Sequence, residues 1–304
     1  MSAPVFRPGP VSVRVPATSA NLGPAFDSAG LCLALHDDVT ARVTDTGLSV
    51  EVEGEGAGDL PRSERHLVVR AMREAFTLLG GQPAGLELRC VNRVPQARGL
   101  GSSSAAIVGG LLAARGLVAG GEELLGDAAV LRLATEVEGH PDNVAACLRG
   151  GVTFSWTDGG EVGVARAEPH PDLTPVVFVP ADRSSTKKVR GMLPAAVPHA
   201  DAAANAGRSA LLALALTAQP ELLLPATRDL LHQGYRAPAM PHTAALVEEL
   251  RARGVAAAVS GAGPTVLALA TTATVDEVAV PAPGWTVLRP AVDREGARLV
   301  PAAG

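Results

Sequence analysis

A short run of small residues, from Pro95 to Ala106, has the composition that a phosphate-binding loop requires. It reads PQARGLGSSSAA, and glycines let backbone N–H groups come close to a phosphate. A helix that begins at the serines would add free N–H donors and the positive end of its dipole, while the serine hydroxyls offer donors or a magnesium ligand. We therefore expect a nucleotide phosphate here. The residues expected to contact the nucleotide are Pro95, Gln96, Ala97, Arg98, Gly99, Leu100, Gly101, Ser102, Ser103, Ser104 and Ala105.

Three common nucleotide-binding motifs do not fit this loop. A Walker loop reads GxxxxGK[ST], but the chain has only two lysines, Lys187 and Lys188, far from the loop. A Rossmann motif needs a third glycine after Gly99 and Gly101. The lysine and HRD motifs of protein kinases are also missing. Phosphate would then have to be bound by backbone N–H groups, serines and a metal ion.

The composition argues against several classes of protein. The formal net charge is -5 and the pI is about 5.8, whereas proteins that bind nucleic acid usually carry a basic excess, so no nucleic-acid partner is expected. The three cysteines are widely spaced, which argues against a disulfide framework or a zinc site and favours reduced thiols in a cytoplasmic protein. The histidines have no metal-binding spacing, and six of the seven receive no role.

Neither the N-terminus nor the most apolar stretch looks like a membrane segment. The first ten residues lack the apolar core of a signal peptide. Residues 254–275 carry no charge and are long enough to span a bilayer. However, the turn sequence from Ser260 to Pro264 divides this stretch into two short strands, so no membrane association is expected.

The elements that must position the loop mix strands and helices without strict alternation, which favours an α+β fold in both halves. The sequence Asp158-Gly159-Gly160 is the best candidate for a linker, because turn-forming residues gather there. Strands are expected at residues 11–15, 31–35, 39–43, 48–52, 86–94, 152–156, 175–179, 255–259, 265–270 and 285–288. Helices are expected at residues 67–79, 103–118, 122–138, 187–193, 202–231 and 243–253.

Three sequence blocks together resemble the GHMP kinase superfamily of small-molecule kinases. They are the loop itself, PATSANLGPAFD at residues 16–27 and SGAGPT at residues 260–265, so the resemblance covers nearly the whole chain. It implies ATP and Mg²⁺ as cofactors and a two-domain α+β fold. Residues 1–158 would form an ATP-binding domain similar to domain 2 of ribosomal protein S5, and residues 159–304 a ferredoxin-like domain, with the active site between them.

Within the superfamily, the details resemble the members that phosphorylate L-homoserine to O-phospho-L-homoserine, a step of threonine biosynthesis. The strings that carry this likeness are EGHPDNVA at residues 138–145, Ser185-Thr186 followed by Arg190, and YRAP at residues 235–238. One departure is Ala25, where the family usually has glycine. The extra methyl group is expected to tune the turn between Asn21 and Asp27 without abolishing the site.

The resemblance assigns roles at the acceptor end of the site. An ammonium group suits the oxygens of Asn21 and Asp27, and a carboxylate suits the planar fork of an arginine, for which Arg190 and Arg236 are the matched positions. The remaining positions expected at the substrate are Asn143, Thr186, Gly261 and Gly263.

The resemblance also gives the metal and catalytic positions. Ser103 and Glu138 are expected to hold Mg²⁺, with Glu136 as a competitor for the second place. Asp142 is the carboxylate expected near the acceptor hydroxyl, either as a base or in a reaction that needs only positioning and electrostatics. His140 is expected to shape the turn with Pro141.

Two alternatives stay open. The chain could be another GHMP kinase, acting on a sugar, mevalonate or a diphosphocytidyl intermediate; a sugar has no carboxylate for the two arginines, and mevalonate kinases normally present a lysine in the N-terminal motif, which this chain lacks. It could also be a non-catalytic family member that binds a metabolite. A homodimer is an option that the sequence leaves open.

Overall fold

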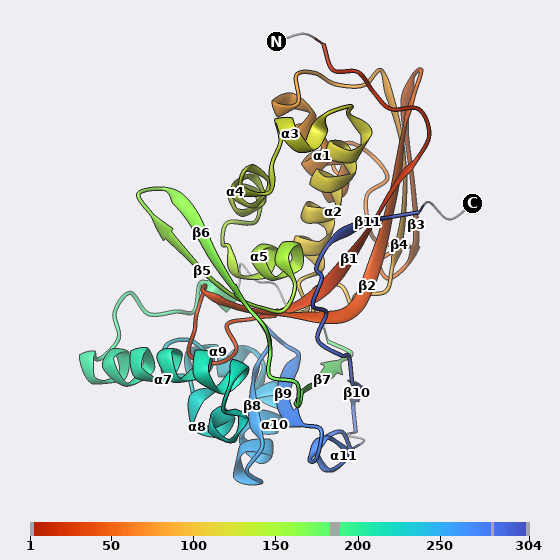
Figure 1. Ribbon diagram of the computed structural model, residues 1–304. Coiled ribbons are helices and arrows are strands. Elements are labelled where there is room, and N and C mark those ends of the chain that lie inside the picture. The colour runs from red at the N-terminus through yellow and green to blue at the C-terminus, as the bar shows by residue number, and fades with distance from the viewer. Residues whose placement is uncertain (1–2, 183–188, 281–282, 302–304) are drawn as a thin grey trace.

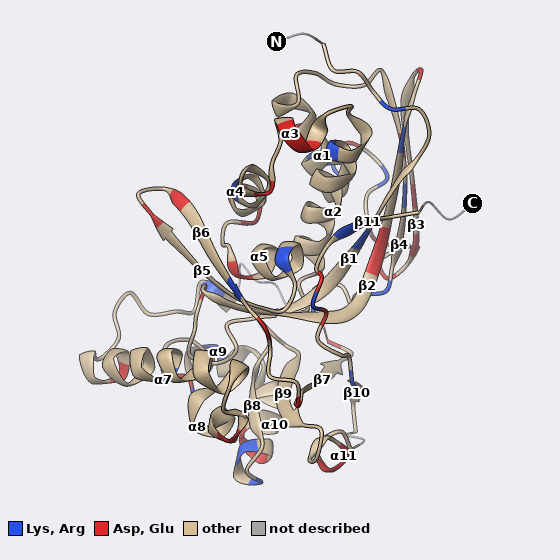
Figure 2. Cartoon of the chain, in the orientation of Figure 1, with Lys and Arg blue, Asp and Glu red and all other residues tan. Residues whose placement is uncertain are grey.

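Two sheets organise the computed structural model, which describes residues 3–182, 189–280 and 283–301. Figure 1 shows one sheet with its helices above and the other below. Both halves mix strands and helices, which confirms the predicted two-domain α+β fold. Charged residues of both signs are interspersed along the two halves (Figure 2).

The first sheet has seven strands in the order β11-β1-β2-β4-β3, with β5 on β2 and β6 on β5. Only β3 and β4 pair in parallel, because helix α1 connects them as a crossover; the other pairs are antiparallel. The strands are β1 (Val11–Ala20), β2 (Ala29–Thr44), β3 (Gly47–Gly54), β4 (Gly85–Asn92), β5 (Val152–Asp158), β6 (Glu161–Ala167) and β11 (Arg298–Val300).

Helices cover one face of this sheet and share a core of valine, leucine and alanine with it (Figure 1). Two glycines let α2 lie close to its neighbours: a Cβ at Gly110 would come within 2.6 Å of the Val68 carbonyl oxygen on α1, and one at Gly109 within 3.0 Å of Val39 on β2. The helices are α1 (Leu67–Leu78), α2 (Ser102–Leu117), α3 (Gly121–Leu124), α4 (Asp127–Glu138) and α5 (Asp142–Arg149).

The second sheet has four antiparallel strands in the order β10-β7-β9-β8. Numbered along the chain, this order is 4-1-3-2, as in a ferredoxin-like domain. Its strands are β7 (Leu173–Pro180), β8 (Ala256–Val259), β9 (Val266–Thr271) and β10 (Trp285–Leu288). Its helical segments are α7 (His199–Thr217), η1 (Pro220–Leu222), α8 (Leu223–Ala226), α9 (Gln233–Arg236), η2 (Ala237–Ala239), α10 (Pro241–Ala252) and α11 (Val275–Val278).

Several expected boundaries are wrong. The linker predicted at residues 158–160 is the turn of the β5–β6 hairpin. The residues do form a turn, but it connects two paired strands of one sheet and not two domains. The strands expected at 31–35 and 39–43 form one long strand, β2, and the helix expected at 122–138 is broken between α3 and α4. The helix expected at 202–231 ends at Thr217. The expected helix at 187–193 falls partly outside the described residues.

The division of the chain at residue 158 stays a prediction. The sheets themselves change between β6 and β7, and β11 returns to the first sheet. The apolar stretch at residues 254–275 forms β8, a turn and β9, as predicted. Among the described residues, no helix has the length and apolarity needed to cross a bilayer.

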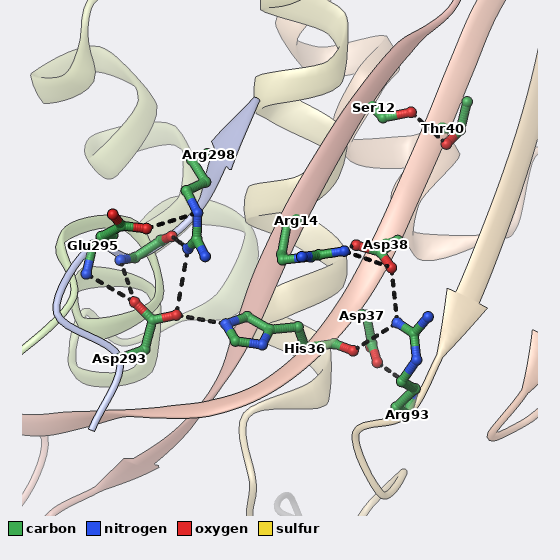
Figure 3. A network of polar contacts seen from close by, with 11 residues as sticks. Ser12, Arg14, His36, Asp37, Asp38, Thr40, Arg93, Asp293, Glu295 and Arg298 are labelled. Atoms are coloured by element: carbon green, nitrogen blue, oxygen red, sulfur yellow. Dashed lines mark hydrogen bonds and ion pairs between the residues drawn. The ribbon is translucent and has the colours of Figure 1, made fainter. Parts of the chain in front are cut away.

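A polar network ties this returning C-terminal segment to the bend of β2 (Figure 3). His36 Nε2 lies 2.5 Å from Asp293 Oδ2, which Arg298 also approaches at 3.4 Å. Burial raises the pKa of Asp293, but hydrogen bonds from His36 and from two backbone N–H groups outweigh it and hold that pKa well below its usual range. The network therefore fixes β2 where it enters the region between the two halves.

Candidate active site

A cavity between the two halves gathers the residues that the sequence predicts for substrate, metal and catalysis. They come from the end of β1, the Gly-rich loop, the ends of α4 and α5, the 260–265 loop and α9, which lie far apart in the sequence. Thr186 lies outside the described residues. The predicted residues that line the cavity are Asn21, Asp27, Ser103, Glu138, Asp142, Asn143, Arg190, Arg236, Gly261 and Gly263.

The Gly-rich loop presents the N-terminus of α2 to this cavity. Gly101 is the N-cap residue and has a φ of 70°, a conformation that favours glycine. A Cβ there would lie 2.0 Å from Thr18 Oγ1, which donates a 2.8 Å hydrogen bond to Asn143 Oδ1. The N–H groups of the first turn of α2 have no acceptor within the helix, so they form a positive, donor-rich end where a phosphate would bind.

The second glycine loop supports the first one from the other half of the molecule. Ser260 Oγ donates to the Gly99 carbonyl oxygen at 2.6 Å, and the backbone N–H of Thr265 donates to Arg98 at 3.2 Å. A Cβ at Gly99 would come within 2.3 Å of the Ser260 carbonyl oxygen. The close approach of the two loops therefore requires a residue without a side chain.

Not every residue of the predicted phosphate loop faces a cavity. Arg98 donates instead to the carbonyl oxygens of Pro180 and Ala181 at 2.9 Å each, so it joins the loop to β7. Leu100 is buried in the apolar core. The loop residues that line the cavities are Gln96, Ala97, Gly99, Gly101, Ser102, Ser103 and Ala105.

The carboxylate of Glu138 lies against the serines of the loop. Its Oε1 accepts hydrogen bonds from Ser103 Oγ at 2.7 Å and from Ser104 Oγ at 2.9 Å. Glu136 points elsewhere and lies 3.5 Å from Arg132. Oxygen donors of this kind suit Mg²⁺, so the geometry favours Glu138 over Glu136 as the carboxylate that could hold the ion.

A histidine–aspartate pair lies at the start of α5. His140 Nδ1 is 2.5 Å from Asp142 Oδ1, which also accepts the backbone N–H of Asn143 at 2.7 Å. Burial lowers the pKa of His140, but the hydrogen bond and charge of Asp142, with the charges of Glu138 and Asp27, raise it overall. His140 therefore does more than shape the turn, because it holds the Asp142 carboxylate in place.

Asp27 and Arg190, which the sequence assigns to opposite ends of the acceptor, bind each other. Two parallel hydrogen bonds of 2.8 and 2.7 Å join the guanidinium to the carboxylate. The hydrogen bond to Asp27 is the main cause of a raised pKa of Arg190. Oxygen or nitrogen atoms of Asp27, His140 and Asp142 also lie within 4.8 Å of one another, so this corner could accept a cation such as an ammonium group.

Arg236 has the least compensated charge at this end of the cavity. Its side chain is among the largest of the fully buried ones and is 2% exposed, yet its Nε has no hydrogen-bond partner among the described residues. Burial is the main cause that lowers the pKa of Arg236, followed by the charge of Arg190. A buried guanidinium without an anionic partner is unfavourable by itself, so Arg236 is the side chain that would gain most from a bound carboxylate.

Asn21 holds the architecture of the site. Its Nδ2 donates to the Gly261 carbonyl oxygen at 2.9 Å, and its Oδ1 accepts the backbone N–H of Asp27 at 2.9 Å. Asn21 and Asp27 both have a positive φ. Ala25, the departure from the family motif, has no positive φ and is buried, so its methyl group is accommodated without backbone strain.

A second cavity of about 320 Å³ adjoins the first and shares Ala97, Ser102 and Ser103 with it. Its walls are largely apolar, but they include His66, for which the sequence predicts no role. His66 is 3% exposed, and neither ring nitrogen has a partner among the described residues. Burial lowers the pKa of His66, so the ring is neutral and offers one donor and one acceptor. No motif in the sequence indicated this residue.

Asp37 supports the start of the Gly-rich loop from behind. Its Oδ1 accepts the backbone N–H groups of Arg93 at 2.6 Å and of Val94 at 2.8 Å, immediately before Pro95 (Figure 3). Burial raises the pKa of this carboxyl to about 6, against the lowering effect of those hydrogen bonds. Asp37 also lines the second cavity, and no motif in the sequence indicated this residue.

Comparison with protein families matches both halves of the chain. The family described as GHMP kinases N terminal domain matches residues 66–151, and GHMP kinases C terminal matches residues 202–282. The chain is 60% identical over 304 residues to the homoserine kinase of Streptomyces avermitilis, with all of both chains covered. It is 59% identical to that of Streptomyces coelicolor, covering all of this chain and 98% of the relative.

Solved structures share the fold along nearly the whole chain. A crystal structure of homoserine kinase from Cytophaga hutchinsonii superposes with a TM-score of 0.80 at 24% identity, covering 97% of this chain and all of the other. A putative homoserine kinase from Listeria monocytogenes gives a TM-score of 0.76 at 29% identity, covering 96% and 100%.

Proposed function

The chain belongs to the GHMP kinase family, among its homoserine kinases, and from this premise we propose that it transfers the γ-phosphoryl group of ATP to the side-chain hydroxyl of L-homoserine. The product is O-phospho-L-homoserine, an intermediate of amino-acid biosynthesis. The observation that carries the proposal is the buried guanidinium of Arg236, whose Nε has no hydrogen-bond partner among the described residues, in the same cavity as the N-terminus of α2. Arg236 suits the α-carboxylate of the acceptor, and the N-terminus of α2 suits the phosphates of ATP.

The nucleotide would occupy both adjoining cavities. The phosphates would lie at the N-terminus of α2, and the adenine ring would lie between the apolar walls of the 320 Å³ cavity, within reach of the neutral His66 ring. A donor and an acceptor on one imidazole complement the amino group and ring nitrogens of adenine. The loop itself contains no lysine, so its backbone N–H groups and serines are the donors proposed to bind the phosphates.

Ser103 and Glu138 would hold Mg²⁺, since their oxygens already meet at 2.7 Å and such oxygens suit this ion. When bound, Mg²⁺ neutralises part of the phosphate charge.

The acceptor would be held by opposite charges at its two ends. Arg236 would bind the carboxylate, with Arg190 beside it, and the acidic corner around Asp27 would attract the ammonium group. The acceptor hydroxyl oxygen then attacks the γ-phosphorus, the bond to the ADP oxygen breaks, and the hydroxyl proton is lost. Asp142, held by His140, is the carboxylate proposed to orient that hydroxyl. Phosphoryl transfer demands little covalent chemistry from a protein, so orientation is the main requirement.

An ADP-release assay with a small panel of acceptors tests the proposal. L-Homoserine should be phosphorylated far faster than mevalonate, galactose or 3-amino-1-propanol, which is homoserine without its carboxylate. A preference for mevalonate or galactose would refute the homoserine assignment and leave a kinase. ATP and Mg²⁺ binding without turnover of any acceptor would instead support a non-catalytic metabolite-binding protein. A homodimer and a cytoplasmic location stay predictions from the sequence.

A further inference from the structure

A third cavity lies in the C-terminal half and shares no lining residue with the active-site cavity. It has a volume of about 710 Å³ and is bounded by α7, α8, α9 and α10. Cavities that bind metabolites commonly have about 300–1,000 Å³ and combine an apolar lining with a few polar groups. The size of this cavity therefore fits a small organic molecule.

Three arginines face this cavity: Arg208 from α7, Arg228 from the loop after α8, and Arg251 from α10. Nη1 of Arg208 is buried and has no hydrogen-bond partner in the described part of the chain. Burial is the main cause that lowers the pKa of Arg251, and the charges of Arg228 and Arg208 lower it further. Arg208 and Arg228 thus each lie close enough to Arg251 to repel its positive charge.

The groups that Arg251 binds do not neutralise its charge. Its guanidinium donates to Thr227 Oγ1 at 2.9 Å and to the carbonyl oxygens of Ala257 and Leu224 at 3.1 and 2.7 Å, all of them uncharged. These bonds fix the guanidinium in place. Arg251 is therefore a rigid cation at the wall of the cavity.

The acidic residues of the cavity compensate these charges only in part. The Asp229 carboxylate already accepts the backbone N–H groups of Leu231, His232 and Gln233, at 3.0, 2.9 and 2.7 Å. The negative charge of Glu248 raises the pKa of Arg251, but the Glu248 side chain is exposed to solvent. An anion near the arginines would relieve the repulsion between them.

The rest of the lining is apolar. Met240, Val247 and Val259 are buried residues of the C-terminal core, and they line the cavity together with Leu224 and Ala244. A carboxylate or phosphate group alone would leave this surface uncovered. The lining therefore suits an anionic group attached to an apolar body.

We propose that this cavity is a second binding site, for a small organic anion whose carboxylate or phosphate group binds Arg208, Arg228 and Arg251 and whose apolar part contacts Met240 and Val247. One wall of the site is formed by residues 229–237. The same segment carries Arg236 into the active site, and His232 anchors it by a 2.7 Å hydrogen bond to the Gly23 carbonyl oxygen. If the proposed function holds, occupancy of the cavity changes the affinity for L-homoserine, since linked sites affect each other reciprocally.

Calorimetric titration of the full-length protein tests the site. The probes are benzoate and phenyl phosphate, which separate the two anionic groups, with benzyl alcohol as the neutral match. ADP and Mg²⁺ are kept saturating so that the phosphate loop is filled. At least one anion should bind with a Kd of about 1 mM or tighter, and benzyl alcohol should bind more weakly. Absence of binding by both anions at about 10 mM would overturn the proposal.

Variants locate the bound probe. The double variant Arg208→Gln/Arg228→Gln should weaken anion binding by about tenfold or more, since charge-assisted hydrogen bonds are lost. The control Arg42→Gln/Arg89→Gln removes two charges from the first sheet and should leave the affinity for the anion unchanged. Arg236→Leu, which changes the active site, should also retain anion binding. Binding that survives the first double variant, or that is lost in Arg236→Leu, would place the anion elsewhere.

Steady-state kinetics test the link to the active site independently. The anion that binds should shift the KM for L-homoserine at least about twofold in the wild type and leave it unchanged in Arg208→Gln/Arg228→Gln. An equal shift in both proteins would mean competition at the active site and would refute the link. If no acceptor is phosphorylated at all, the proposed function fails, while the titration still decides whether the second site exists.

Discussion

The two ends of the active-site cavity are built in different ways. At the nucleotide end, the groups that can bind phosphate are backbone N–H groups and serine hydroxyls from one stretch of about ten residues. At the acceptor end, charged side chains from four separate segments meet: Asp27, His140 with Asp142, Arg190 and Arg236. The nucleotide end therefore depends on conformation that only glycine allows, and the acceptor end depends on charges that balance one another across the fold.

This difference predicts where the chain tolerates substitution. Steric changes should be most damaging at the nucleotide end, where backbone approaches backbone. Charge changes should act selectively at the acceptor end, where each group has a defined partner.

The largest effect is expected from Gly101→Val. The new Cβ would overlap Thr18 Oγ1 and force a β-branched residue into a positive φ. We expect ATP binding to be nearly abolished and kcat/KM to fall by about a hundredfold or more, measured by calorimetry and ADP release, with circular dichroism as the check of folding. Gly139→Ala is the matched control, because Gly139 also has a positive φ but has open space around its Cβ position. Unchanged ATP affinity in folded Gly101→Val would refute the loop assignment.

The next largest effect is expected at Glu138, the charged side chain that is proposed to hold Mg²⁺ at the nucleotide end. Glu138→Gln and Ser103→Ala should each lower kcat by about tenfold or more and raise the Mg²⁺ concentration needed for half activity. Glu136→Gln is the control, since Glu136 lies beside Arg132 and not at the serines. If Glu136→Gln has the effect instead, the proposed metal position is wrong.

A selective effect is expected from Arg236→Leu at the acceptor end. A charge-assisted hydrogen bond contributes about 1.5–3 kcal/mol, so the KM for L-homoserine should rise by about tenfold or more, with little change in the KM for ATP. The slow reaction with 3-amino-1-propanol should be less affected, since that acceptor has no carboxylate to lose. Equal damage with both acceptors would show that Arg236 supports the fold or the phosphates.

A smaller effect is expected from His66→Phe in the 320 Å³ cavity, where adenine is proposed to bind. One neutral hydrogen bond contributes about 0.5–1.5 kcal/mol, so the KM for ATP should rise about two- to tenfold, while the KM for L-homoserine stays the same. His66→Asn keeps a donor and an acceptor and should restore most of the affinity. If His66→Asn and His66→Phe are equally impaired, His66 has a packing role only.

The smallest effect on turnover is expected from Asp37→Asn, because an amide oxygen can still accept both loop N–H groups. The effect should appear in stability against pH. The folded-state pKa is raised from 3.8 to about 6, so the stabilising contribution of the protonated carboxyl is complete below about pH 4 and is lost as the pH rises through about 6. Between pH 4 and 7 the wild type should lose about 2 kcal/mol relative to Asp37→Asn, measured by urea unfolding at each pH. Parallel pH profiles for the two proteins would contradict the buried, charged carboxylate.

The sequence by itself determined the family and the α+β fold, and it indicated the loop that is proposed to bind the nucleotide. This was possible because the steric demands of a phosphate loop act on neighbouring residues: a Cβ at Gly99 would meet the backbone of the 260–265 loop and one at Gly101 would meet the Thr18 side chain. That requirement is visible in a contiguous motif. The matched positions at the acceptor end could also be named from motifs, but their partners could not.

Only the tertiary structure decided which side chains meet. In the structure, Glu138 lies at the serines and Glu136 does not, and Asp27 pairs with Arg190. Nε of Arg236 has no partner among the described residues, and Arg98 bonds to β7 and not to the phosphate site. It also revealed His66 and Asp37, and it made a hairpin turn of the expected linker. The physical reason is that the side-chain contacts join distant positions, as Ser103 with Glu138 and Asp27 with Arg190, which are 35 and 163 residues apart. Such contacts leave no local pattern in the chain.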